Sequence, residues 1–431
     1  MSLFAILITI IFILLGMPLF LGLGLLSLLL FYVNDGIDSV ITIFLDPFGR
    51  LSQNDLMLPV LYFGIMGYIL AGSQMPRRIV TIFQYILQKT IGNKLYTFGM
   101  VSILVSAFFT PLTGASGVTI IALGGILYSV MNRAGYDHKE NIGIITSSGS
   151  LGLLFFPSIP VILYGIVSNN KVSIQDLFIA GLIPGLVFIT LPLLYTGIKY
   201  YRSNHSVQEV EKLSFREVRS DFLKLLLELA IMPLLFYLFL TGSITISEIG
   251  LIAMIYYLIL EIGFFRDMTI IAFKNQFIEA ITILGGIIVI IFFAVSFTSF
   301  LIDHQIPMQL FNLMENHIKS KMTFLILLNL FLLLVGSLMD IFSAIIVVAP
   351  LVIPVAELYQ INMVHLGILF LTNLEIGYIT PPVGINLFLS SFRFKLPLIE
   401  IYYSVLPYLF LMLFAQLLIT YIPYLSLFFL N

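Results

Sequence analysis

Apolar segments that are long enough to cross a membrane follow one another along most of the 431-residue chain. A membrane-spanning helix needs about 20 apolar residues. Spans are therefore predicted at 55–73, 174–201, 222–241, 244–265, 270–301 and 397–430. Residues 1–33 are uncharged and carry Gly16-Met17-Pro18 in the middle, which predicts either two short helices or one long kinked helix. Residues 79–94 mix basic and apolar side chains and predict an amphipathic helix in the membrane interface.

Two further apolar segments, 141–168 and 363–392, are interrupted in the middle. The second contains Gly377-Tyr378-Ile379-Thr380-Pro381-Pro382-Val383-Gly384, in which two prolines remove two backbone donors and a helix cannot continue. The first contains Gly152-Leu153-Leu154-Phe155-Phe156-Pro157-Ser158, which lies 225 residues earlier. Within lipid, freed carbonyl groups are tolerated only where protein or a wet cavity satisfies them. Paired breaks at membrane depth therefore predict a binding site of the kind found in transporters.

Two helical hairpins are predicted beside these breaks. Residues 95–109 and 118–131 are each too short to span comfortably and flank a tip of small residues, which predicts a re-entrant hairpin at about 95–131. A second hairpin is predicted at about 323–356, with its tip at 336–340. The same offset of 225 residues places Ala115 on Asp340, so that one tip lies on the other. The chain is therefore interpreted as an internal repeat.

The distribution of basic residues predicts how the two halves are oriented. If residues 77–94 face the cytoplasm, 16 of the 20 lysines and arginines lie inside, including those of 77–94, and four lie outside: Arg50, Lys171, Lys319 and Lys321. The two hairpins then enter from opposite faces of the membrane. We thus expect an all-α polytopic membrane protein with inverted-topology repeats, the first at 1–201 and the second at 222–431, joined by a cytoplasmic linker at 202–221.

Composition agrees with a membrane protein and excludes several kinds of chemistry. The chain is 60% hydrophobic and 10% charged with a mean hydropathy of +1.10, whereas soluble domains carry about 25% charged residues. It has no cysteine, which excludes disulfides and thiolate metal sites. Its five histidines lack metal-binding spacing. Neither a nucleophile–base constellation nor a nucleotide-binding loop is present, so we do not expect an enzyme or an ATP-driven pump.

The breaks and hairpin tips carry small and oxygen-bearing residues that suit ion and anion binding. Helix N-termini attract anions, and unwound carbonyls with side-chain oxygens bind a hard cation such as sodium. The predicted ion-binding residues are Gly114, Ala115, Ser116, Ser158, Gly336, Asp340, Asn373, Thr380 and Gly384. The predicted substrate-binding residues are Ser116, Pro157, Ser158, Thr380, Pro381 and Pro382.

Simpler interpretations of some of these residues stay open at this stage. The serines at 147–150 could serve only close helix packing. Asp340 could be a hydrated helix cap. Glu375, an ionisable residue at membrane depth, could hold two helices together as well as belong to a site.

At the level of motifs, the chain resembles the large membrane (M) subunit of TRAP (tripartite ATP-independent periplasmic) transporters nearly end to end. The segments that carry the resemblance are Gly114-Ala115-Ser116-Gly117, Phe156-Pro157-Ser158-Ile159-Pro160, Asn373-Leu374-Glu375-Ile376-Gly377 and Thr380-Pro381-Pro382-Val383-Gly384-Ile385-Asn386-Leu387-Phe388. Two positions depart from the family pattern. Phe156 stands where a proline is usual, and Ala115 stands where a serine is common, which removes one side-chain oxygen from the expected first ion site.

The resemblance implies a sodium-driven elevator in the bacterial inner membrane, with Na⁺ as coupling ion and no other cofactor. Its partners would be a small four-helix membrane (Q) subunit and a soluble periplasmic substrate-binding (P) protein. Its substrate would be an organic anion: a dicarboxylate, sialic acid or another sugar acid, or a 2-oxoacid. The alternatives are a stand-alone sodium:carboxylate symporter of the divalent-anion type and, less favoured, an intramembrane enzyme or a channel.

Overall fold

A computed structural model describes residues 19–36, 41, 45, 57–169, 171–201, 212–306, 308–309, 318 and 320–430. The predictions for residues 1–18, and those for most of the connections 37–56, 202–211 and 307–319, lie outside the described residues. Within the described ranges all regular secondary structure is helical. Nine of these helices are long and apolar enough to cross a membrane, or ten if the bent pair at 57–90 counts as one span. The predicted all-α membrane fold is confirmed.

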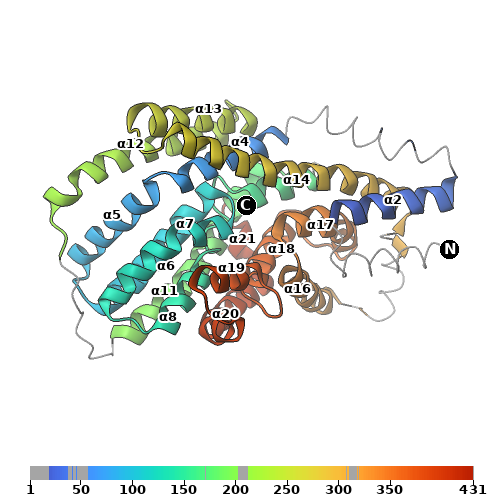
Figure 1. Ribbon diagram of the computed structural model, residues 1–431. Helices are drawn as coiled ribbons and strands as arrows, with labels where there is room; N and C mark the ends of the chain where they lie inside the picture. The colour runs from blue at the N-terminus through green and yellow to red at the C-terminus, as the bar shows by residue number, and fades with distance from the viewer. Residues whose placement is uncertain are drawn as a thin grey trace.

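One group of helices lies along the upper side of the molecule in Figure 1. Its longest member, α14, is 34 residues long and packs against both α2 and α4, and α13 packs on α4. The bounds of the group are α2 (Leu19–Asp35), α4 (Met57–Gly72), α12 (Phe215–Leu240), α13 (Ile246–Leu258) with the π-helical turn η2 (Ile259–Phe264), and α14 (Ile270–Asp303). We call these helices the scaffold group.

The second group contains both predicted hairpins and both interrupted helices. In the first half it comprises α6 (Leu95–Thr113), α7 (Ser116–Ala134), α8 (His138–Ser148), α9 (Ile159–Val167), α10 (Ile174–Ala180) and α11 (Leu182–Tyr201). In the second half it comprises α16 (Lys321–Leu338), α17 (Ile341–Leu358), α18 (Met363–Gly377), α19 (Ile385–Phe394), α20 (Leu398–Tyr421) and α21 (Tyr424–Leu427). We call these helices the hairpin group, which lies below the scaffold group in Figure 1.

The repeat predicted from the sequence recurs in the helix boundaries. Helix α7 begins at Ser116 and α17 at Ile341, and α8 begins at His138 and α18 at Met363, so both pairs keep the offset of 225 residues. The packing repeats as well. Helix α7 of the first half packs on α19 of the second, and α17 of the second half packs on α9 of the first. The two halves are therefore interlocked rather than side by side.

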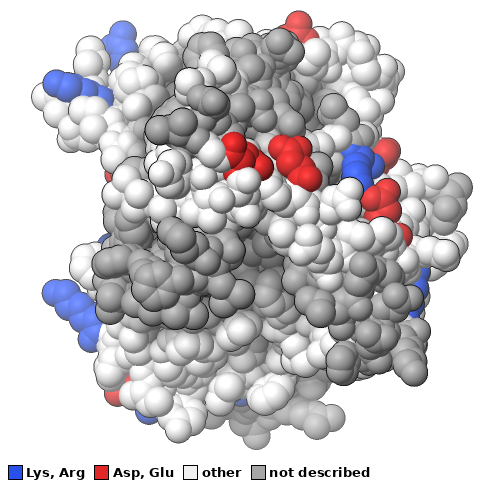
Figure 2. Space-filling view, turned by 90° about the vertical axis from the view of Figure 1, so that its right-hand side faces the viewer, with Lys and Arg blue, Asp and Glu red and all other residues white. Residues whose placement is uncertain are grey.

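Ion pairs at the helix ends show that the two hairpins enter from opposite ends. The ends of hairpin α6–α7 lie at the end where Lys139, at the start of α8, pairs with Glu400 at the start of α20. We call this the basic end. The ends of hairpin α16–α17 lie at the opposite end, where Lys171 after α9 pairs with Glu357 of α17 and the Nζ atom of Lys321 donates to the carbonyl of Gln360. Figure 2 views the right-hand end of Figure 1 and shows acidic side chains in the upper middle of this face, with basic side chains beside them and at its left edge.

Helix α5 (Met75–Thr90) bends away from α4 by 69° and joins the two groups. It packs on α12 of the scaffold group and on α6 of the hairpin group. Its Arg78 is buried and forms ion pairs with Glu228 of α12, Glu261 of η2 and Asp267. Both glutamates are fully buried, so this cluster holds α5 against the scaffold group.

Three sequence expectations need correction. The helices of the first hairpin were predicted to be too short to span, but α6 and α7 have 19 residues each because α6 continues through Pro111 to Thr113. The predicted tip at Gly336 is still helical, and α16 ends two residues later. The linker predicted at 202–221 is shorter, because α12 begins at Phe215 behind a capping box formed by Ser214 and Glu217.

Candidate functional site

The second break packs tightly against the tip of the second hairpin. A Cβ atom added to Gly377 would lie 2.5 Å from the Cα atom of Gly336, so only glycine allows the two backbones to approach this closely. The amide of Gly384 donates to the carbonyl of Ser337 at 2.9 Å, and the amide of Ile341 donates to the hydroxyl of Tyr378 at 2.8 Å. One backbone amide of the break and one of the hairpin tip are thus each satisfied by a group of the other segment.

Carbonyl oxygens converge on Gly384, which has a φ angle of +44°. A Cβ atom at this position would lie 2.8 Å from the carbonyl oxygen of Tyr378 and 2.9 Å from that of Thr380. Such an arrangement of backbone oxygens suits a small hard cation. In the described part of the chain no group of three His, Cys, Asp or Glu residues could hold a metal ion, so a cation at the break would rely mainly on backbone and hydroxyl oxygens.

The first break and the first tip repeat this arrangement with different residues. Gly114 ends α6 in the left-handed conformation, and a Cβ atom there would lie 2.5 Å from the side chain of Ile159. Thr110 donates its hydroxyl to the carbonyl of Gly149 at 3.0 Å. The hydroxyls of Ser150 and Ser158 are fully buried and lack a hydrogen-bond partner among the described residues. Buried hydroxyls without a protein partner are open to a water or an ion.

A hydrogen bond joins the two halves of the repeat at this point. Ser116, the first residue of α7, donates its hydroxyl to the Oδ1 atom of Asn386 in α19 at 2.8 Å. Both side chains are buried. The first hairpin tip is therefore fixed to the helix that follows the second break.

A cavity of about 560 Å³ lies between the two hairpin tips and the scaffold group. From the tips come Ala115, Ser116, Asp340 and Ser343, and from α19 come Ile385 and Leu389. From the scaffold group come Tyr68 and Ala71 of α4, and Gln276, Glu279, Thr282, Ile283, Gly286, Ile287 and Ile290 of α14. Asp340 and Glu279 are the charged side chains of this lining, which has no basic residue. We call this space the central cavity.

The structure separates the predicted site residues into those at the cavity and those behind it. Ala115, Ser116 and Asp340 line the central cavity. The others lie outside its lining: Gly114, Pro157, Ser158, Gly336, Asn373, Thr380, Pro381, Pro382 and Gly384. Of these, Asn373 lies inside α18, where its amide donates to Asn329 at 2.7 Å and its Oδ1 atom has no described partner. Pro382 is exposed, and its carbonyl accepts from the hydroxyl of Tyr402.

The contacts of Asp340, Ser147, Ser148 and Glu375 bear on the interpretations that the sequence left open for these residues. Asp340 is the N-cap of α17 and accepts a hydrogen bond from the amide of Ser343 at 3.0 Å, as a cap does, while it also faces the cavity. Ser147 and Ser148 donate to carbonyls one turn back in their own helix, which agrees with a packing role. Glu375 is buried, and its Oε1 atom has no partner among the described residues.

The sequence analysis did not predict that α14 forms one wall of the central cavity. Gln276, Glu279, Ile283 and Gly286 recur at helical spacing and share one face of α14. The available signal in the sequence was that three polar residues of this long apolar helix, Gln276, Glu279 and Thr282, lie within two turns. The sequence alone gave no indication that this face meets the hairpin tips.

Phe156 was read from the sequence only as a missing proline, but it forms the centre of an aromatic cluster. Its ring lies 5.0 Å from that of Phe236 and 5.8 Å from that of Phe239, both on α12. It also makes edge contacts with Phe63 of α4 and Phe178 of α10. The first break is therefore packed directly against the scaffold group through this phenylalanine.

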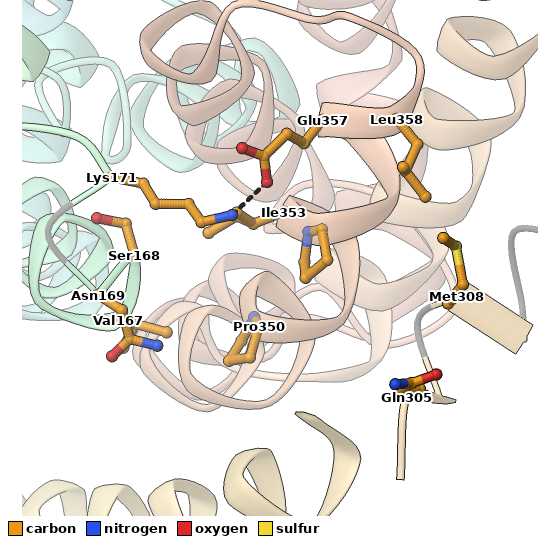
Figure 3. A pocket seen from close by; sticks show the side chains of 11 residues that line it. Val167, Ser168, Asn169, Lys171, Gln305, Met308, Pro350, Ile353, Glu357 and Leu358 are labelled. Atoms are coloured by element: carbon orange, nitrogen blue, oxygen red, sulfur yellow. Dashed lines mark hydrogen bonds and ion pairs between the residues drawn. The ribbon is translucent and has the colours of Figure 1, made fainter. Parts of the chain in front are cut away.

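A second cavity, of about 520 Å³, lies at the end opposite the basic end. Figure 3 shows Lys171 reaching across it to Glu357, with Pro350 below the ion pair. Residues from the end of α9, from α17 and from Gln305 and Met308 line it. The ion pair ties the helix after the first break to the second hairpin, but both side chains are partly exposed and it contributes little stability.

Comparison with known proteins agrees with this architecture. The sequence model of the family described as "Tripartite ATP-independent periplasmic transporter, DctM component" matches residues 6–425. The chain belongs to this family. As a TRAP transporter permease component it is a membrane transport protein and not an enzyme.

Its similarity to individual relatives extends over nearly the whole chain. It is 29% identical over 406 residues to the C4-dicarboxylate TRAP transporter large permease protein DctM of Pseudomonas aeruginosa, covering 94% of this chain and 92% of that protein. It is 26% identical over 420 residues to the isethionate TRAP transporter permease protein DctMQ of Oleidesulfovibrio alaskensis, covering 97% of this chain and 64% of that protein.

A solved structure supports the fold independently. The crystal structure of the Alcanivorax borkumensis YdaH transporter aligns with a TM-score of 0.66, covering 94% of this chain and 98% of that one, at 17% sequence identity. At this identity the likeness shows the shared fold.

Proposed function

We propose that the chain is the large permease subunit of a TRAP transporter that imports an organic anion into a bacterial cell across the inner membrane, driven by a sodium gradient. Membership of the TRAP family supports the transport role, and the named relatives support organic anions as substrates. The observation that carries the proposal is that both hairpin tips, which come from oppositely oriented repeats, line one central cavity.

Anion binding would rely on backbone groups and on sodium. Helices α7 and α17 begin at Ser116 and Ile341, at the lining of the cavity. Because helix N-termini attract anions, their free amides can bind a carboxylate there. Since no basic side chain lines the cavity, the substrate carboxylate must find its positive partners in these amides and in the coupling ion.

Sodium would bind behind each tip, where the two breaks present oxygens. In the second half the candidate ligands are the carbonyls of Ser337, Tyr378 and Thr380 together with the Asp340 side chain. In the first half they are the hydroxyl of Ser158 and backbone oxygens of the tip around Ala115.

Transport would proceed by an elevator movement of the hairpin group along the scaffold group. The central cavity lies against Tyr68 and Ala71, at the end of α4 nearest the basic end, and against α14 from Gln276 onward. If the basic end faces the cytoplasm, as the positive-inside rule requires, this conformation is the inward-facing one. The outward-facing state would place the tips nearer the other ends of α4 and α14.

The proposal includes two partners, a small four-helix membrane (Q) subunit and a periplasmic substrate-binding (P) protein. The isethionate relative is named DctMQ and is longer than this chain, which supports a second membrane component in this type of transporter. The exposed apolar side chains of α12 and α14, among them Leu226, Leu234 and Ile278, offer a surface that lipid or such a subunit can cover.

Reconstitution tests this proposal. The chain, its small membrane subunit and its binding protein are placed in liposomes, and uptake of a labelled carboxylate is measured with an inward gradient of sodium, potassium or protons. We expect uptake under the sodium gradient alone. Uptake that is equal under all three gradients, or driven by protons, would contradict sodium coupling, and the lack of uptake of any carboxylate would contradict anion transport.

A further inference from the structure

Glu279 is the one acidic side chain that the scaffold group brings to the central cavity. It lies on the exposed face of α14, among Gln276 and Thr282. In the described part of the chain it makes no hydrogen bond or ion pair, whereas Asp340 across the cavity is engaged in capping α17 through Ser343. The cavity therefore presents one free carboxylate opposite the hairpin tips.

A free carboxylate in this position has a consequence for the ligand. No lysine, arginine or histidine lines the cavity, so nothing on the scaffold side neutralises Glu279. Two like charges that are brought within a few ångströms of each other at such a wall repel. An anion whose negative charges lie at both ends, such as a dicarboxylate bound to the tips by one end, would direct its second charge at this wall.

The chemistry of the same wall suits a different kind of group. A carboxylate accepts hydrogen bonds and makes strong ones with hydroxyl donors. Gln276 and Tyr68 beside it can both donate and accept. Three such side chains along α4 and α14 form a surface that complements several hydroxyl groups, as a sugar carries.

We propose that Glu279 is a specificity-determining residue, an inference that rests on the transport function proposed above. Glu279 accepts hydrogen bonds from substrate hydroxyls and selects monocarboxylates with several hydroxyl groups over dicarboxylates. The carboxylate of the substrate lies at the hairpin tips near Ser116, and its hydroxyl-bearing end meets the wall of Glu279, Gln276 and Tyr68. A cavity of about 560 Å³ has room for a molecule of this size.

The test uses two assays, one of them without the binding protein, so that selection by the binding protein does not hide selection by the permease. The permease with its small membrane subunit is purified in sodium, and the binding of gluconate, glucuronate and succinate is measured by calorimetry without the binding protein. Sodium-driven counterflow of the same compounds is then measured in proteoliposomes. The variants are Glu279→Gln, which keeps the shape and removes the charge, and Asp303→Asn, which removes a charge from the far end of α14 outside the cavity.

For the wild type and for Asp303→Asn we expect gluconate to bind at least about tenfold more tightly than succinate. In Glu279→Gln we expect this ratio to fall about tenfold, through weaker gluconate binding and tighter succinate binding. Tighter binding of succinate than of gluconate by the wild type, or an unchanged ratio in Glu279→Gln, would overturn this inference.

Two further outcomes separate this inference from the proposed function. Sodium-dependent counterflow with the same selectivity in wild type and Glu279→Gln overturns the role of Glu279 alone and leaves the transport function standing. A change in the sodium concentration for half-maximal counterflow, with unchanged selectivity, assigns Glu279 to the cation and also overturns it. Absence of counterflow for every carboxylate at any sodium concentration would contradict the proposed function itself.

Discussion

Single residues decide how closely the helix breaks and hairpin tips approach each other. Gly336 and Gly377 meet backbone to backbone, and Gly384 leaves space for two carbonyl oxygens. The sequence placed Gly377 and Gly384 at the second break and Gly336 at the predicted tip of the second hairpin. The structure gives Gly336 and Gly377 a different role, because both lie within helices and permit contact rather than unwinding.

Replacement of Gly377 by alanine should separate the second tip from its break. The new Cβ atom would lie 2.5 Å from backbone atoms of Gly336, which cannot move aside as a flexible side chain can. Overpacking of this kind costs about 1–3 kcal/mol. We expect a lower unfolding temperature for the purified protein in detergent, with a larger loss in transport than the stability change explains.

Gly285 provides a matched control on α14. A Cβ atom there meets nothing within 4 Å. Gly285→Ala should therefore leave transport unchanged and stabilise the helix by about 0.5–1 kcal/mol. Equal stability of Gly377→Ala and Gly285→Ala would contradict the close approach described for Gly336 and Gly377.

Asp340 combines a capping role with a position at the cavity, and substitutions can separate the two. Asparagine also caps helices well, so Asp340→Asn should change stability by less than about 0.5 kcal/mol, whereas Asp340→Ala should cost about 0.5–2 kcal/mol. If the charge binds sodium, Asp340→Asn should raise the sodium concentration for half-maximal uptake about tenfold or more. Unaltered sodium dependence in Asp340→Asn would contradict a role of Asp340 in sodium binding and leave only its role as the helix cap.

At the scale of elements, the sequence predicted the interrupted helices and hairpins because their signals are local. Pro157 and the pair Pro381-Pro382 lie in the breaks, and each proline removes a backbone donor and crowds the preceding turn of a helix. The helix boundaries were predicted less accurately, since α6 continues through Pro111 to Thr113. Contacts between elements could not be predicted, because Arg78 meets glutamates 150 and 183 residues away in the chain.

Among the ion-paired residues described above, replacement of Arg78 should lower the free energy of unfolding most. Glu228 and Glu261 are fully buried on α12 and η2, and without Arg78 they would be left as unpaired buried charges. Removal of one partner of a buried ion pair costs about 3–5 kcal/mol. Arg78→Leu should therefore strongly lower the unfolding temperature in detergent and detach α5 from the scaffold group.

Two comparisons check the cause. Lys171→Leu breaks the partly exposed pair with Glu357 and should cost less than about 1 kcal/mol. Addition of Glu228→Gln to Arg78→Leu should recover part of the stability, because it removes one of the buried charges. A double variant as unstable as Arg78→Leu would show that packing of the arginine, and not its charge, is what matters.

At the scale of the whole molecule, the proposed elevator movement would use the inverted repeat to relate the observed conformation to a second one. The central cavity uses α14 around Ile283. The offset of 225 residues relates this position to Leu58 on α4. In the exchanged conformation the tips would face α4 near Leu58, from the other side of the membrane.

Because the chain has no cysteine, single cysteines can report these two states without background. Ile283→Cys should react with a membrane-impermeant maleimide from the cytoplasmic side, and Leu58→Cys from the periplasmic side. Conditions that speed one reaction should slow the other. Labelling of both positions from the same side would contradict the exchange of the two repeats.

The aromatic cluster around Phe156 joins the two groups of helices that would slide past each other in the proposed elevator movement. Each of its ring contacts with Phe63, Phe236 and Phe239 would be broken and remade once per turnover. A well-packed aromatic pair contributes about 0.5–1.5 kcal/mol beyond its buried area. Breaking these contacts would slow the movement and raise the activation enthalpy of transport. The turnover rate should therefore fall steeply on cooling.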